Sequence, residues 1–172
     1  MDLMYYMDKG GVIMYILLAL NIIGFTTMII KLIQFLLAKS KTNRIISEVH
    51  ESFRSSDKEA ELALGKDLLA EKMVRYEKGL STVRIIASIA PLLGLLGTVI
   101  GVLTAFEAIS KQGLGDPSIF AAGISLALIT TVGGLVVAIP HYIGYNYLVG
   151  MLDKLEANLN TQMSLKIYES KS

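Results

Sequence analysis

The side chains that could handle a proton inside this chain's apolar segments are few, and most of them are hydroxyls. Thr98 lies in one apolar segment, and Ser125, Thr130 and Thr131 lie in the next. A hydroxyl donates one hydrogen bond and accepts two, so these residues can hold water or bind a carboxyl group in either protonation state. They cannot store a proton near neutral pH, because that needs a titratable group of suitable pKa.

Two side chains in or beside these segments are candidates for carrying a proton or attracting cations. His141 is a candidate proton relay, since histidine changes charge near neutral pH and is costly inside a membrane. The alternative for His141 is an interfacial position beside Tyr142. Glu107 follows the first of the two segments, where it is either a solvated end charge or a funnel for incoming cations. The uncharged stretches 85–106 and 117–152 contain no carboxylate, so a complete relay needs an acid from elsewhere.

Small residues at helical spacing accompany the hydroxyls in both segments. Such residues let helix backbones approach closely in lipid, as in a GxxxG pair. One interpretation is plain helix packing, and the other is a narrow polar passage lined by the hydroxyl-bearing faces. The set comprises Pro91, Gly94, Gly97 and Gly101 in the first segment and Ala127, Gly134, Ala138 and Pro140 in the second.

Three apolar runs must form the helices that position these residues. They cover 10–30, 85–106 and 117–152 in a chain that is 53% hydrophobic. A helix rises about 1.5 Å per residue, so roughly 20 residues cross a hydrocarbon core about 30 Å thick. The sequence therefore predicts an all-α membrane protein with three transmembrane helices and long cytoplasmic helical extensions. The first run is predicted to be a retained span and not a signal peptide, because no basic stretch precedes it.

The distribution of positive charge predicts the orientation. The polar region 39–84 carries ten Lys and Arg residues, whereas the later loop carries only Lys111. The positive-inside rule places that polar region in the cytoplasm and the N-terminus in the periplasm. Lys31, near the end of the first span, is expected to snorkel to lipid headgroups. The predicted segments are a periplasmic stub 1–10, spans 11–38, 85–110 and 118–147, a periplasmic loop 111–117, and cytoplasmic segments 39–84 and 148–172.

The composition argues against several function classes. The chain has no cysteine, and His50 and His141 give no metal-ligand spacing, so no metal site or cofactor is expected. A net charge of +1 without a basic stripe predicts no nucleic-acid partner. No nucleophile–base constellation is visible, so we expect no enzyme. A small secondary transporter would show paired repeats and a midplane binding site, and neither is visible.

Two ordered motifs resemble those of the MotA/TolQ/ExbB proton-channel family, and the ExbB/TolQ branch most closely. Residues 90–101, Ala-Pro-Leu-Leu-Gly-Leu-Leu-Gly-Thr-Val-Ile-Gly, are similar to the second-span motif. Residues 123–131, followed by Ala138-Ile139-Pro140 and Tyr145-Asn146, are similar to the third-span motif. Many relatives carry a glutamate in the third-span motif at the place of Leu126, so the role of that glutamate does not transfer to this chain.

The resemblance implies a homo-pentameric ring in a bacterial inner membrane. Spans two and three would enclose helices of an ExbD/TolR-like one-span partner, which carries the proton-binding aspartate, and Thr98 and Thr131 would face it. Proton flow would drive rotation, and the work would reach the outer membrane through a TonB-like or TolA-like protein. An ExbB-like role in outer-membrane transport, a TolQ-like role in envelope maintenance and a non-conducting membrane scaffold all stay open.

Overall fold

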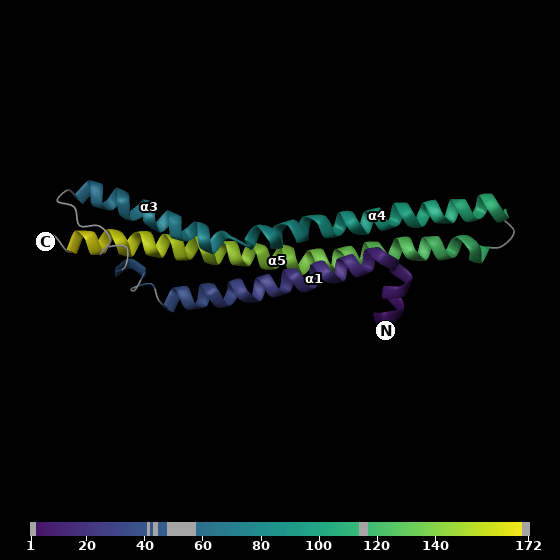
Figure 1. Cartoon of the computed structure of the whole chain (residues 1–172), viewed down its shortest axis with the longest axis horizontal. Coiled ribbons are helices and arrows are strands. Elements are labelled where there is room, and N and C mark those ends of the chain that lie inside the picture. The colour runs from purple at the N-terminus through teal and green to yellow at the C-terminus, as the bar shows by residue number, and fades with distance from the viewer. Residues whose placement is uncertain (1–2, 41, 43–44, 48–57, 114–116, 170–172) are drawn as a thin grey trace. The chain divides into compact units, whose positions relative to one another are not determined.

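Every element in the described part of the computed structural model is an α-helix, so the predicted all-α fold is confirmed there (Figure 1). The structure describes residues 3–40, 42, 45–47, 58–113 and 117–169. The helices are α1 (Leu3–Ser40), α3 (Lys58–Glu77), α4 (Leu80–Gln112) and α5 (Pro117–Glu169). Parts of the predicted segments 1–10, 39–84, 111–117 and 148–172 lie outside the described residues, and the predicted membrane boundaries stay predictions.

Three of these helices are long and apolar enough to cross a bilayer. The qualifying stretches are Met4–Ala38 in α1, Leu80–Lys111 in α4 and Phe120–Tyr168 in α5. Their most apolar windows have mean hydropathies of 2.2, 2.3 and 2.2. The three predicted spans therefore correspond to three real helices.

The chain forms two compact units. Unit 1 comprises Met1–Thr26 and Thr82–Gly144, and unit 2 comprises Thr27–Ser81 and Tyr145–Ser172. Unit 1 therefore contains the first part of α1, nearly all of α4 and the first half of α5. Unit 2 contains the rest of α1 and α5 together with α3.

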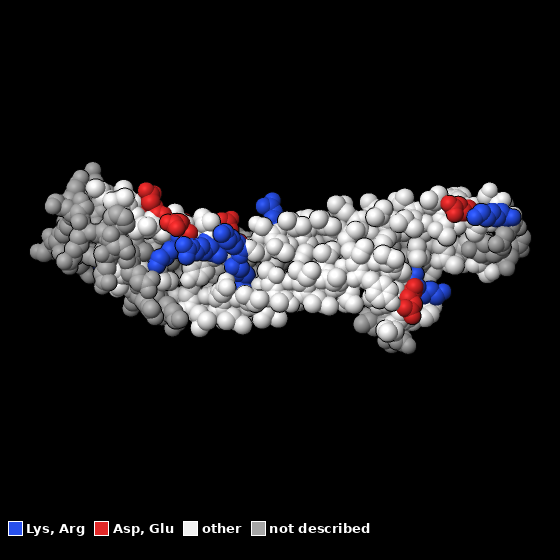
Figure 2. All heavy atoms as spheres, viewed as in Figure 1, with Lys and Arg blue, Asp and Glu red and all other residues white. Residues whose placement is uncertain are grey.

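Unit 1 has a small apolar core where its three helices meet. Buried Leu17 of α1, Ile86 and Ala90 of α4, and Val137 and Ala138 of α5 form it. Many larger apolar side chains of the same helices point outward instead and remain exposed. Figure 2 shows a wide uncharged surface along these helices on the face in view. An exposed apolar surface of this kind is what lipid or other helices cover in a membrane.

A glycine bends the beginning of α1. Gly11 has φ 60° and ψ −151°, a backbone conformation that is essentially restricted to glycine. Across this bend the Tyr15 hydroxyl donates a hydrogen bond to Asp8 Oδ1 (3.1 Å), and Lys9 Nζ lies 5.6 Å from the ring centroid of Tyr5. The first turns of α1 therefore leave the direction of the remaining helix at Gly11, as the purple ribbon in Figure 1 shows.

Unit 2 has the larger core, in which α5 contributes a regular apolar stripe. Leu148, Leu152, Leu155, Leu159 and Met163 are buried at spacings of three and four residues. This spacing places them on one face of a helix. They pack with buried residues of α1 and α3, among them Phe35, Ala38, Leu69 and Met73.

The contacts of Lys31 contradict the prediction that its side chain snorkels to lipid headgroups. The residue is 7% exposed, and its Nζ donates hydrogen bonds to Gln34 Oε1 (3.0 Å) and to the Tyr76 carbonyl (3.1 Å). The Tyr76 carbonyl belongs to the last turn of α3, where helix carbonyls lack intrahelical partners and favour a cation. The end of α3 therefore binds this ammonium group inside unit 2, a contact that the sequence pattern did not indicate.

Candidate functional site between α4 and α5

Glycines bring the backbones of α4 and α5 into contact within unit 1. A Cβ built on Gly101 would lie 2.5 Å from the Gly123 carbonyl oxygen, and one on Gly134 would lie 2.6 Å from the Ala90 carbonyl oxygen. A Cβ on Gly94 would lie 2.9 Å from the Thr130 carbonyl oxygen. Real Cβ atoms do not approach backbone atoms so closely, so this seam requires glycine at these positions.

Thr130 lies inside this seam. Its side chain is 0% exposed, and its Oγ1 donates to the carbonyls of Leu126 and Ala127, 3.0 Å from each. Gly97 of α4 faces it so closely that an added Cβ would overlap the threonine side chain. The hydroxyl is therefore satisfied by its own helix and has no accessible surface in this subunit.

Thr98 and Thr131 lie at the edge of the same seam, and both are half-buried. Thr98 Oγ1 donates to the Leu95 carbonyl (2.6 Å). Thr131 Oγ1 lies 3.2 Å from the Ala127 carbonyl and 3.4 Å from the Gly94 carbonyl, so its single proton is shared between α5 and α4. Because each proton is already engaged with the backbone, each oxygen presents acceptor capacity, which suits water or a protonated carboxyl group.

The remaining predicted site residues divide by burial. Ser125, Pro91 and Pro140 are half-buried, whereas Glu107 is exposed near the end of α4. Glu107 thus has the exposure of an end charge, which is compatible with both roles considered for it. The predicted packing residues Gly94, Gly97, Gly101, Ala127, Gly134 and Ala138 are all buried.

His141 is buried inside unit 1, and the relay role and the interfacial position considered for it both stay predictions. The ring is 0% exposed and packs in unit 1 against α1, where its centroid lies 4.9 Å from that of Phe25. Its Nδ1 is 2.7 Å from the Val137 carbonyl. The missing bulk of Gly24 on α1 makes room for the ring, because a Cβ there would overlap Nε2.

Three small residues outside the predicted packing set complete these contacts. Ala90, Ala105 and Gly123 are buried, and Ala105 Cβ would lie 2.9 Å from a Cβ on Gly123. The buried face of α4 follows positions 90, 94, 97, 101 and 105, a pattern of three and four residues that was readable from the sequence. The fit of Gly24 to His141 was not readable, because nothing local pairs α1 with α5.

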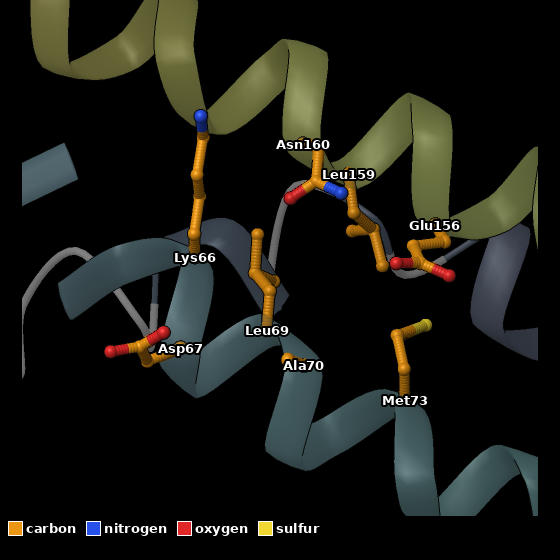
Figure 3. Close-up of a pocket in the computed structure, with 8 residues that line it drawn as sticks. All are labelled: Lys66, Asp67, Leu69, Ala70, Met73, Glu156, Leu159 and Asn160. Carbon is orange, nitrogen blue, oxygen red and sulfur yellow. The ribbon is translucent and has the colours of Figure 1, made fainter. Parts of the chain in front are cut away.

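A separate cleft of about 400 Å³ lies in unit 2 between α3 and α5 (Figure 3). Lys66 of α3 and Glu156 and Asn160 of α5 supply polar groups around it, and Leu69 and Leu159 supply apolar surface. Figure 3 shows Asp67 directed away from α5. Within the described ranges no three His, Asp or Glu side chains lie close enough to hold a metal ion.

Comparison with known proteins decides the family. A model of the MotA/TolQ/ExbB proton channel family matches residues 30–161, which include most of both glycine-bearing helices. The chain belongs to the MotA/TolQ/ExbB proton channel family. Among curated relatives, the names point to the ExbB-like branch, and with its three apolar helices this family member is a multi-pass membrane protein.

Three ExbB-like relatives show how far the similarity extends. A putative biopolymer transport protein ExbB homolog of Methanothermobacter thermautotrophicus is 34% identical over 84% of this chain and 62% of the relative. The biopolymer transport protein ExbB of Aquifex aeolicus is 46% identical over 42% of this chain and 49% of the relative. That of Helicobacter pylori is 44% identical over 45% and 54%. The aligned region thus spans less than two thirds of each relative.

Proposed function

We propose that this chain is the ring-forming subunit of a proton-driven motor in a bacterial inner membrane. Five copies would surround helices of an ExbD-like one-span partner, and proton passage would turn one component against the other. The work would energise TonB-type transport across the outer membrane. In this arrangement the N-terminus is periplasmic, the C-terminus is cytoplasmic, and the subunit itself is not an enzyme.

One observation carries the proposal: hydroxyls without a carboxylate line the edge of the α4–α5 seam. Thr98 and Thr131 are half-buried, and their protons point to backbone carbonyls. Stretches 85–106 and 117–152 contain no Asp or Glu. These two hydroxyls can therefore accept hydrogen bonds from a protonated carboxyl group or from water, but they cannot store the proton. A partner must supply the acid.

The structure narrows the set of proposed pore-lining residues. Thr130 is fully buried against Gly97, so we assign it to helix packing. Ser125 is half-buried six residues before Thr131 on α5 and remains in the proposed lining. The lining we propose is thus Thr98, Thr131 and Ser125, with the glycine seam behind them holding α4 and α5 together.

A non-conducting membrane scaffold is the second candidate. The observation that favours it is the use of the small faces inside one subunit, where Gly94, Gly101 and Gly134 contact the facing helix. When the small-residue faces of α4 and α5 already pack against each other, fewer hydroxyls remain to line a proton passage. The scaffold and the motor differ in whether function needs the proton gradient.

Complementation in a Gram-negative host tests the proposed function. The host lacks its own ExbB and TolQ and receives this chain with a one-span protein that bears an intramembrane aspartate. We expect uptake through a TonB-dependent receptor to return and to stop when a protonophore collapses the gradient. Restored detergent resistance without uptake would support the TolQ-like role instead. Assembly of both proteins without either phenotype would contradict the motor and favour the scaffold.

A further inference from the structure

One ring nitrogen of His141 has a hydrogen-bond partner among the described residues, and the other has none. Its ring is 0% exposed, and Nδ1 lies 2.7 Å from the Val137 carbonyl. A carbonyl oxygen only accepts hydrogen bonds, so Nδ1 carries the proton and donates it. Nε2 is therefore the lone-pair nitrogen of a neutral ring. Among the described side chains, Nε2 is a buried polar atom without a hydrogen-bond partner.

The backbone of α1 covers the Nε2 atom of His141. Gly24 lies directly over Nε2, and an added Cβ at that position would overlap the ring. The Phe25 ring meets the imidazole at an interplanar angle of 67°, with 4.9 Å between centroids. Backbone carbonyls in this part of α1 belong to the helix, so they are engaged along its own axis. The docked α1 thus excludes water from Nε2. It also offers no acceptor for the N–H group that protonation of Nε2 would create.

No charged side chain faces the ring from the helices that surround it in unit 1. Residues 10–26 of α1 contain Tyr15 as their only titratable side chain, and it is exposed and bonded to Asp8. Residues 82–106 of α4 contain only Arg84, which is exposed. On α5 the neighbouring Tyr142 is exposed as well. A positive charge on His141 would therefore have no counter-charge in this environment.

We propose that His141 is a proton-binding site that α1 covers, so that a bound proton and a docked α1 exclude each other. With α1 docked, a second proton would create a buried cation and an N–H group without an acceptor, and both are costly. When α1 moves away from α5, water reaches Nε2. The Nε2 lone pair then takes a proton from water, while Nδ1 keeps its hydrogen bond to Val137. Redocking returns that proton to water.

The coupling has a defined direction. Acid favours the form in which α1 has left the ring, because only that form binds the additional proton. The ratio of released to docked α1 rises as the pH falls, by at most about tenfold per pH unit, the limit for one proton. This proposal is independent of the motor function, because it concerns one subunit's own helices.

Nitrogen NMR spectroscopy of the full-length chain in liposomes tests the state of the ring. The chain contains two histidines, so His50→Asn leaves His141 as the single ¹⁵N-histidine signal. At about pH 8 we expect a protonated Nδ1 and an unprotonated Nε2. A protonated Nε2 with a bare Nδ1 would overturn the proposal. So would a doubly protonated ring in the docked form at lower pH.

Distance measurements test the coupling to α1. The chain has no cysteine, so spin labels can be placed at Ile22→Cys on α1 and Ile139→Cys on α5, both of which are exposed in unit 1. Between about pH 8 and about pH 5, we expect the short-distance population to decline in the otherwise native chain. His141→Gln, which cannot be charged, should abolish that decline. Distances that do not respond to pH, or a response that persists in His141→Gln, would overturn the proposal.

Discussion

Gly97 and Thr130 are in direct contact in the α4–α5 seam, and a larger side chain at either position would displace the other residue. Thr130 is fully buried, and a Cβ on Gly97 would overlap its side chain. The same seam holds Thr98 and Thr131 at its edge. The position of the proposed proton-handling hydroxyls therefore depends on the glycines behind them.

Replacing Gly97 by leucine should separate the two helices. Overpacking costs about 1 to 3 kcal/mol of the free energy of unfolding, and the bulk at Gly97 has no space to occupy. We expect a lower thermal midpoint by circular dichroism in detergent and a lower yield of oligomer by native mass spectrometry. Val99→Leu is the matched control, because Val99 is an exposed position of the same helix. Equal midpoints and yields for both variants would refute the packing argument.

Replacing Thr98 or Thr131 by valine should stop partner-dependent work while the oligomer survives. Valine keeps the shape of threonine but removes the hydroxyl acceptor, and neither site is fully buried. Complementation and native mass spectrometry measure the two properties separately. Thr104→Val is the control, since Thr104 is exposed and its hydroxyl also donates to the preceding turn, to Ile100 (2.8 Å). Full activity of both pore variants would remove these threonines from the proposed lining.

Removing the buried ammonium group of Lys31 should weaken unit 2. Lys31→Met leaves the Tyr76 carbonyl at the end of α3 without its donor. An unsatisfied buried polar group costs about 1 to 3 kcal/mol, so we expect the free energy of unfolding to fall by that amount. Lys78→Met serves as the control, because Lys78 is exposed beside the same helix end. A thermal midpoint as high for Lys31→Met as for Lys78→Met would show that the contact adds no stability.

Two glycines outside the seam should respond in opposite directions to alanine. Gly79 has φ +93° between α3 and α4, where alanine is strained, and its Cβ would lie 3.1 Å from Lys31 Cε. Gly150 lies inside α5 with nothing within 4 Å of an added Cβ. We expect Gly79→Ala to destabilise the protein and Gly150→Ala to stabilise it by up to about 1 kcal/mol. Thermal unfolding of both variants checks the signs, and a stabilising Gly79→Ala would contradict the backbone assignment.

Helix-forming stretches and small-residue faces could be predicted from the sequence because they depend on local periodicity. The spacing of Gly94, Gly101 and Gly134 indicated close helix packing, and those residues do contact the facing helix. Two polar residues could not be placed that way. The partners of Lys31 and His141 are Tyr76 and Gly24, which are distant in sequence, and each fit depends on how helices pair. The headgroup position considered for Lys31 was a local inference, and its contact with Tyr76 overruled it.

Proton flux into liposomes tests the central claim most directly. The claim is that this subunit supplies hydroxyl groups and that a partner protein supplies the proton-binding carboxyl group. The chain is reconstituted alone, with a one-span partner bearing an intramembrane aspartate, and with the same partner carrying asparagine instead. A pH-sensitive dye inside the liposomes reports flux under an imposed potential. We predict flux only for the combination that contains the aspartate. Flux from the chain alone, or equal flux with the asparagine partner, would contradict the account.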